Sequence, residues 1–163
     1  MNLISEKMYK STENRGNADI YKILIVDDDV WFHKYFTKHL KSWGFEVISA
    51  YNPYEGISLA AKENPKLIFL DYIMPEMNGD NVLKILKAVE QTKDIPVVFI
   101  SGNLSADVIG AAYKMGAKGF LTKPVSLKVI YKKIEECLGS DVFAKLKLEH
   151  NPSDEPDYKV FPL

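Results

Sequence analysis

Short apolar runs alternate with longer amphipathic segments through the middle of the chain. Each run holds four or five residues, most of them β-branched or bulky. The runs are residues 23–26, 46–50, 67–70, 97–100 and 119–122. Runs of this length and composition are typical of strands that are buried on both faces of a sheet. The pattern therefore predicts five buried strands.

The segments between these runs have the periodicity of amphipathic helices. After Asp29, apolar residues recur about every 3.6 positions until Gly44 ends the pattern. Residues 52–55, Asn-Pro-Tyr-Glu, combine a cap residue, a proline and a glutamate in the order that starts a helix. Further helices are expected at about 79–89, 105–115 and 126–138.

This alternation predicts an α/β fold with a five-stranded parallel sheet. Parallel neighbours need crossover connections, and the helices supply them on both faces of the sheet. The ends of the chain are more polar and lack a sustained period. We therefore expect a polar leader at 1–20, a folded domain at 21–139 and a C-terminal tail at 140–163, with room in the tail for a short helix before a disordered segment.

Composition narrows the range of functions. The chain has 21 basic and 22 acidic side chains, and Arg15 is its only arginine, so direct binding to nucleic acid is not expected. A single cysteine, Cys137, excludes an intramolecular disulfide. No apolar run approaches the roughly 18 residues of a membrane span, and the first ten residues do not resemble a signal peptide. We expect a cytoplasmic protein without membrane contact.

Polar residues stand where four of the predicted strands end. Parallel strands of an open sheet place ligands beyond their carboxyl ends, so these residues are expected at one edge. They are Asp27, Asp28 and Asp29 after the first strand, Asp71 after the third, Ser101 after the fourth, and Lys123 after the fifth. Asp29 is also well placed to cap the helix that follows.

Grouped carboxylates indicate a metal site. Asp27, Asp28 and Asp71 repel one another unless they bind protons or a cation, and Lys123 offsets only one of the three charges. Hard oxygen ligands without histidine or cysteine suit Mg²⁺. An aspartate beside a metal, a lysine and the Ser101 hydroxyl is arranged for phosphoryl transfer, and we expect Asp71 to be the acceptor.

Four segments together resemble the receiver domain of two-component response regulators, a chemotaxis-type domain with a flavodoxin-like fold. They are Ile23-Leu-Ile-Val-Asp-Asp-Asp29, Leu70-Asp-Tyr-Ile-Met-Pro-Glu-Met-Asn-Gly79, Ser101 and Phe120-Leu-Thr-Lys-Pro124. The resemblance covers about residues 21–138. It implies a doubly wound five-stranded parallel sheet of order 2-1-3-4-5.

The resemblance also implies a metal set. It makes Asp71 the phosphoacceptor and a ligand of Mg²⁺, with Mn²⁺ as an alternative metal. Asp28 is implied as a direct ligand, Asp27 as a ligand mainly through water, and Ile73 as a ligand through its backbone carbonyl.

Three further residues take roles by the same resemblance. Lys123 would pair with the phosphoryl group, Ser101 would turn its hydroxyl toward it, and Phe120 would be the aromatic switch residue. The bond before Pro124 matches one that is cis in the family. Two departures are that Gly102 stands where alanine is usual and that Phe120 lacks the hydroxyl of a tyrosine. A core role remains the alternative for Phe120.

The function implied is a phosphorylation-dependent switch. The donor would be a histidine kinase or a histidine phosphotransfer protein, and the receiver would catalyse its own phosphorylation and dephosphorylation. Output would pass to a downstream protein on the surface formed by residues 105–115, 119–122 and 126–138. The residues after Leu138 are too few for a DNA-binding module, so either a stand-alone receiver or a fragment is expected. The alternatives are a degenerate receiver serving as a scaffold and an aspartate-nucleophile phosphatase.

Two further predictions concern the exposure of Trp31 and of the three histidines. Trp31 lies off its apolar stripe, which indicates either an exposed docking surface or packing against the leader or the loop near Pro75. The three histidines have no metal-ligand partners at suitable spacing. We expect His33, His39 and His150 to be exposed to solvent.

Overall fold

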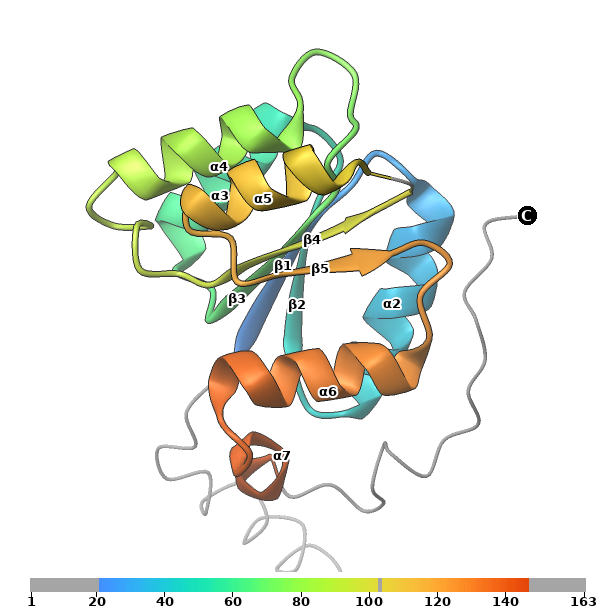
Figure 1. Cartoon of the computed structure of the whole chain (residues 1–163). Helices are drawn as coiled ribbons and strands as arrows, with labels where there is room; N and C mark the ends of the chain where they lie inside the picture. The colour runs from blue at the N-terminus through green and yellow to red at the C-terminus, as the bar shows by residue number, and fades with distance from the viewer. Residues whose placement is uncertain (1–20, 103, 147–163) are drawn as a thin grey trace, which may run out of the picture.

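A five-stranded parallel sheet of order β2-β1-β3-β4-β5 forms the centre of the molecule (Figure 1). The computed structural model describes residues 21–102 and 104–146. The strands are β1 Lys22–Val26, β2 Glu46–Ala50, β3 Leu67–Leu70, β4 Val97–Ser101 and β5 Gly119–Thr122. The predicted α/β fold and its strand order are confirmed.

Helices cover both faces of this sheet. They are α2 Val30–Ser42, α3 Pro53–Glu63, α4 Gly79–Ala88, α5 Ala106–Lys114, α6 Leu127–Leu138 and α7 Val142–Lys145. Figure 1 shows α3, α4 and α5 together on one face, and α2 and α6 on the other. No helix among the described residues is both long enough and apolar enough to cross a bilayer.

Each face of the sheet has its own apolar core, and β1 contributes to both. Ile23 and Ile25 belong to the core under α2 and α6, whereas Leu24 and Val26 belong to the core under α3, α4 and α5. Successive side chains of a strand point to opposite faces. This explains why the strand is an unbroken apolar run.

Side-chain caps fix where the helices begin. A carboxylate oxygen of Asp29 accepts hydrogen bonds from the N–H groups of Trp31 and Phe32 at 2.9 and 3.2 Å, which confirms its capping role. Asn52 accepts from the Glu55 N–H at 2.9 Å, and Glu55 in turn accepts from the Tyr51 N–H at 2.8 Å. Such caps satisfy donors that a helix leaves unpaired at its start.

The short helix α7 is packed into the core. Val142 and Phe143 are buried, and the Phe143 ring contacts the rings of Trp43, Phe45 and Tyr131. The core therefore includes residues that the sequence pattern assigned to the C-terminal tail. The expected leader at 1–20 and the rest of that tail, 147–163, lie outside the described residues.

Candidate functional site

Strand pairing brings Asp27 and Asp71 to the same edge of the sheet. Val26 and Leu70 are partners in the register of β1 and β3, and each precedes one of these acids. The Asp71 N–H donates to the Val26 carbonyl at 2.8 Å. After β1 the chain forms β2 on one side of that strand, and it then returns to form β3 on the other side. This reversal of strand order is where open parallel sheets bind ligands.

Asp27, Asp28 and Asp71, here called the acid cluster, form a group suited to a metal ion. One carboxylate oxygen from each residue lies within 4.8 Å of the others. Asp27 and Asp71 are buried, whereas Asp28 is exposed to solvent. Three oxygen donors with one open side suit a hard divalent cation such as Mg²⁺, which retains water ligands. The donor set therefore fits the expected metal.

Lys123 is the cation of the acid cluster. Its Nζ donates to Asp27 Oδ2 at 2.7 Å and lies 3.9 Å from Asp71 Oδ2. The ammonium also lies 4.6 Å from the centre of the Phe32 ring, a favourable cation–π position. The sequence pattern indicated only that the apolar residues of α2 face the sheet, so this contact of Phe32 with Lys123 was not predicted.

The acid cluster is electrostatically strained without a second cation. Burial, and then the nearby Asp27 carboxylate, raise the pKa of Asp71 to about 6, although Lys123 opposes the shift. Burial also raises the pKa of Asp27, against the hydrogen bond from Lys123. Carboxylates that are costly to ionise give the site a physical reason to bind a divalent cation.

Ser101 brings a buried hydroxyl to the same edge. It ends β4, and its carbonyl accepts from the Lys123 N–H at 2.7 Å, so the backbones of the two residues are linked. Its side chain is buried, and Oγ has no hydrogen-bond partner within the described part of the chain. A buried hydroxyl without a partner is costly, and a ligand oxygen near it would remove that cost.

Phe120 belongs to a row of aromatic rings that leads to α5. Its partly buried ring stacks on Phe99 at a centroid distance of 5.0 Å and meets Tyr113 edge to face at 5.3 Å. Phe99 also contacts Tyr72, the residue after Asp71, at 5.5 Å. The row therefore links the loop after β3 to the surface of α5.

Close packing holds the loop between β3 and α4 against the site. The Gly79 N–H donates to the Tyr72 carbonyl at 2.7 Å. A Cβ atom at Gly79 would lie 2.6 Å from the Asp71 carbonyl oxygen and 2.6 Å from the Phe99 ring. Only glycine allows the backbone at position 79 to lie this close to Asp71 and Phe99. This explains why the motif that begins at Asp71 ends in glycine.

Three apolar residues that are close in sequence to the acid cluster have exposed side chains. Trp31 is 65% exposed, which confirms its predicted position off the apolar stripe of α2. Val30, beside it, and Ile73, two residues after Asp71, are also more than half exposed. The Ile73 N–H forms a hydrogen bond that lowers the pKa of Asp71, so this residue contacts the site through its backbone.

The predicted exposure of His33 is wrong. Only 2% of its surface is exposed, because its ring lies 4.3 Å from the Tyr51 ring and its Nε2 is 2.7 Å from the Asp27 carbonyl oxygen. His39 is half-buried and contacts Tyr35, and His150 lies outside the described residues. The sequence offered no signal for His33, since its burial depends on a residue 18 positions away.

Comparison with known proteins identifies the family. A model of the response regulator receiver domain matches residues 23–135. The chain is 32% identical to protein PilH of Pseudomonas aeruginosa, over 72% of this chain and 97% of PilH. It is 30% identical to chemotaxis protein CheY1 of Helicobacter pylori, over 74% of this chain and 98% of CheY1. It is also 32% identical to the probable transcriptional regulator ycf29 of Pyropia yezoensis, over 80% of this chain, but it spans only 59% of that protein.

Solved structures agree with this relationship. Chemotaxis protein CheY4 of Vibrio cholerae superimposes with a TM-score of 0.69 at 26% identity, over 72% of this chain and 98% of CheY4. A chain of the CheX-CheY-BeF3-Mg²⁺ complex of Borrelia burgdorferi gives a TM-score of 0.67 at 26% identity, over 72% of this chain and 89% of that one. With the fold, the acid cluster and the family match in agreement, this chain belongs to the response regulator receiver domain family of two-component signalling.

Proposed function

We propose that this receiver is a phosphorylation-dependent switch in which Asp71 accepts a phosphoryl group from a phosphohistidine donor. The donor is a histidine kinase or a histidine phosphotransfer protein. The observation that carries the proposal is the acid cluster itself, in which a buried Asp71 lies beside Asp27, Asp28 and the ammonium of Lys123. The family match supports the same role, because receiver domains are phosphoacceptor switches.

A divalent cation belongs to this proposal. The carboxylates of Asp27, Asp28 and Asp71 and the backbone carbonyl of Ile73 would hold Mg²⁺, with Mn²⁺ as the alternative. When bound, the cation neutralises the acid cluster and stabilises negative charge on phosphoryl oxygens. The related CheY complex that contains BeF3 and Mg²⁺ supports this choice of metal.

The chain's own residues supply the rest of the transfer. An ionised oxygen of Asp71 attacks phosphorus, a P–O bond forms, and the P–N bond to the donor imidazole breaks with its electron pair left on nitrogen. Lys123, 3.9 Å from Asp71 Oδ2, is placed to pair with a phosphoryl oxygen. The buried Ser101 hydroxyl has a hydrogen to donate to another. The receiver thus catalyses its own phosphorylation, and in our proposal its dephosphorylation, while the donor supplies the group.

The output of the switch follows from the position of Ser101 and Phe120. A hydrogen bond from the Ser101 hydroxyl to a phosphoryl oxygen would draw the end of β4 toward the site. Phe120 is stacked on Phe99, which lies in β4 with Ser101, and it contacts Tyr113 of α5. This change would therefore reach the surface of α5, β5 and α6. We assign that surface to a downstream protein. The exposed side chains of Trp31 and Ile73 beside the acid cluster suit docking of the donor.

The two alternatives have less support. A scaffold needs no ionisable set at the strand ends, yet the described residues group three carboxylates with a lysine and a buried hydroxyl. An aspartate-nucleophile phosphatase would need a second acid two residues after the nucleophile. Ile73 occupies that position.

A phosphorylation assay tests the proposal. The full chain is incubated with acetyl phosphate and Mg²⁺, and its intact mass is followed with and without a chelator. We expect the addition of one phosphoryl group, which chelation blocks and Asp71→Asn abolishes. Asp80→Asn is the matched control, because Asp80 lies in α4, outside the acid cluster, and its carboxylate lies 3.8 Å from the Lys84 ammonium. Addition that persists in Asp71→Asn would refute the assignment.

A further inference from the structure

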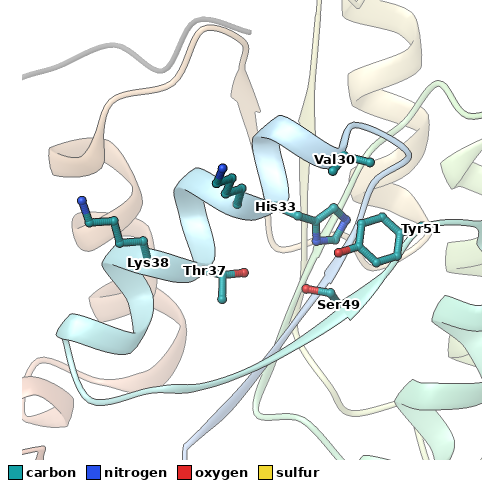
Figure 2. Close-up of a pocket in the computed structure, with 7 residues that line it drawn as sticks. Val30, His33, Thr37, Lys38, Ser49 and Tyr51 are labelled. Atoms are coloured by element: carbon teal, nitrogen blue, oxygen red, sulfur yellow. The ribbon is translucent and has the colours of Figure 1, made fainter.

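His33 is a buried polar residue that the proposed transfer does not use. It lies near the start of α2, and its side chain is almost fully buried. Figure 2 shows its ring turned from α2 toward Tyr51, the residue that follows β2, and the two ring centroids lie 4.3 Å apart. Burying a polar ring costs free energy unless the ring forms a hydrogen bond, so the partner of His33 indicates what this residue does.

The His33 ring holds the backbone carbonyl of Asp27. Its Nε2 lies 2.7 Å from the carbonyl oxygen, which only accepts hydrogen bonds, so Nε2 is the donor. No backbone N–H of the described residues donates to this carbonyl. The hydrogen bond is buried, so water competes with it little. The direction of the Asp27 carbonyl therefore depends on His33.

This carbonyl belongs to the peptide group that joins Asp27 to Asp28. The Asp27 N–H donates to the Ala50 carbonyl at 3.1 Å, so that side of the residue is held by the sheet. Asp28 is exposed, and packing alone does not fix its side chain. Because a peptide group is planar, the direction of the Asp27 carbonyl also sets the direction in which the chain enters Asp28. The hydrogen bond from His33 thus acts on two members of the acid cluster.

We propose that His33 is a positioning residue of the metal site. Its hydrogen bond to the Asp27 carbonyl fixes the peptide group between Asp27 and Asp28 and so holds both carboxylates in the arrangement that binds a divalent cation. This inference rests on the proposed function, since it takes the acid cluster as the Mg²⁺ site. Mg²⁺ demands nearly ideal ligand positions, and contacts behind a metal ligand commonly change metal affinity by about 10- to 100-fold.

Two variants of His33 test whether its N–H is what matters. His33→Phe keeps an aromatic ring against Tyr51 but has no donor, and we expect it to bind Mg²⁺ about tenfold more weakly than the parent. His33→Gln returns an N–H at a similar reach from the helix, and its affinity should recover to within about threefold of the parent. Magnetic resonance of the isotope-labelled full chain, titrated with Mg²⁺, measures these affinities from the amides of Asp28 and Ile73.

The backbone nitrogen of Asp28 reports on the same hydrogen bond without metal. It shares a peptide group with the Asp27 carbonyl, so its resonance should shift in metal-free His33→Phe and return toward the parent value in His33→Gln. Equal Mg²⁺ affinity in the parent and His33→Phe would overturn the positioning role alone. Equally weak binding in both variants would also overturn it, because the N–H would then not be the cause. A parent that binds no Mg²⁺ would remove the metal assignment and this inference with it.

Leu40→Val separates positioning from stability. Leu40 is buried in α2 two turns after His33, so this variant lowers the stability of the domain without changing the donor to the Asp27 carbonyl. Its Mg²⁺ affinity should stay within about twofold of the parent. A loss as large as that of His33→Phe would mean that destabilisation alone weakens the metal site, and it would contradict the proposal.

Tyr51→Ala provides a second test that does not alter His33, and it decides the question if His33→Phe does not fold. Tyr51 is 44% exposed, and its truncation removes the ring that packs on His33. We expect Mg²⁺ binding about threefold weaker than in the parent, because the His33 ring is then held less firmly toward Asp27. Tyr54→Ala is the matched control, since Tyr54 is 58% exposed in α3 and its ring is not among those that contact His33 in the described part of the chain. Equal Mg²⁺ affinity in these two variants would overturn the proposal.

Discussion

The ionisation of Asp71 is coupled to the stability of the metal-free domain. Its pKa is raised to about 6 because its carboxylate is buried and lies near Asp27. In the unfolded chain an aspartate titrates near pH 4, so the folded state binds this proton more tightly. The stabilisation from the bound proton is complete below about pH 4 and is lost as the pH rises to about 6.

Asp71→Asn should therefore stabilise the metal-free protein in a pH-dependent manner. Asparagine resembles the protonated side chain, so little change in the free energy of unfolding is expected at pH 4. At pH 7.5 the gain should reach about 1–3 kcal/mol, because the parent must then ionise a buried carboxylate. Urea unfolding in chelator at pH 4 to 8 measures the difference. A gain in the free energy of unfolding that does not vary with pH would contradict a raised pKa of Asp71.

Lys123 compensates the buried charge of Asp27, and its removal should be costly. Lys123→Met leaves Asp27 without its 2.7 Å partner, and we expect a loss of about 3 kcal/mol at neutral pH. Lys84→Met is the matched control, since Lys84 pairs with Asp80 at 3.8 Å on the surface of α4 and such pairs contribute under about 1 kcal/mol. Denaturant unfolding of both variants measures these losses in the free energy of unfolding. Similar losses would mean that Lys123 contributes no more than a surface ion pair.

At the level of elements, the acid cluster depends on how closely α4 approaches β3. Gly79→Ala would place a Cβ atom 2.6 Å from the Asp71 carbonyl oxygen, and we expect a loss of about 1–3 kcal/mol in stability together with weaker Mg²⁺ binding. Gly110→Ala is the control, because a Cβ there meets no atom within 4 Å and alanine favours a helix by about 0.5–1 kcal/mol. Calorimetry and metal titration measure both effects. Unchanged Mg²⁺ affinity in Gly79→Ala would separate the loop from the metal site.

Helix α7 is expected to stabilise the whole domain although it contains only four residues. Phe143→Ala removes a buried ring that contacts Trp43, Phe45 and Tyr131, and a loss of about 3–5 kcal/mol is expected. Val129→Ala, at an exposed position of α6, should cost much less. Thermal unfolding compares the two. Equal losses would show that α7 packs only loosely on the core.

At the scale of the molecule, the sequence predicted the sheet and the acids for a simple physical reason. Buried parallel strands appear as apolar runs, and the residues after them meet at one edge, so Asp27 and Asp71 could be placed together without coordinates. The burial of His33 and Phe143 could not be predicted in this way. It depends on Tyr51 and Trp43, which fold against these residues from other elements.

That Lys123 lies closer to Asp27, at 2.7 Å, than to Asp71, at 3.9 Å, also required the structure. Lys123 and Asp27 are 96 positions apart, and strand order places the lysine near both acids without choosing between them. The closer partner, Asp27, is also the less exposed of the two acids, and a buried carboxylate needs a charged partner. Residue types thus identified the members of the site, whereas their protonation and pairing depend on the three-dimensional packing.

The most direct test of the proposed function is to locate the phosphoryl group chemically. After reaction with acetyl phosphate and Mg²⁺, borohydride reduces an aspartyl phosphate to homoserine, which peptide mass spectrometry can place in the chain. The proposed function predicts homoserine at position 71 and unmodified aspartate at positions 27 and 28. Phosphate on Ser101 or on a histidine, with Asp71 unchanged, would contradict it.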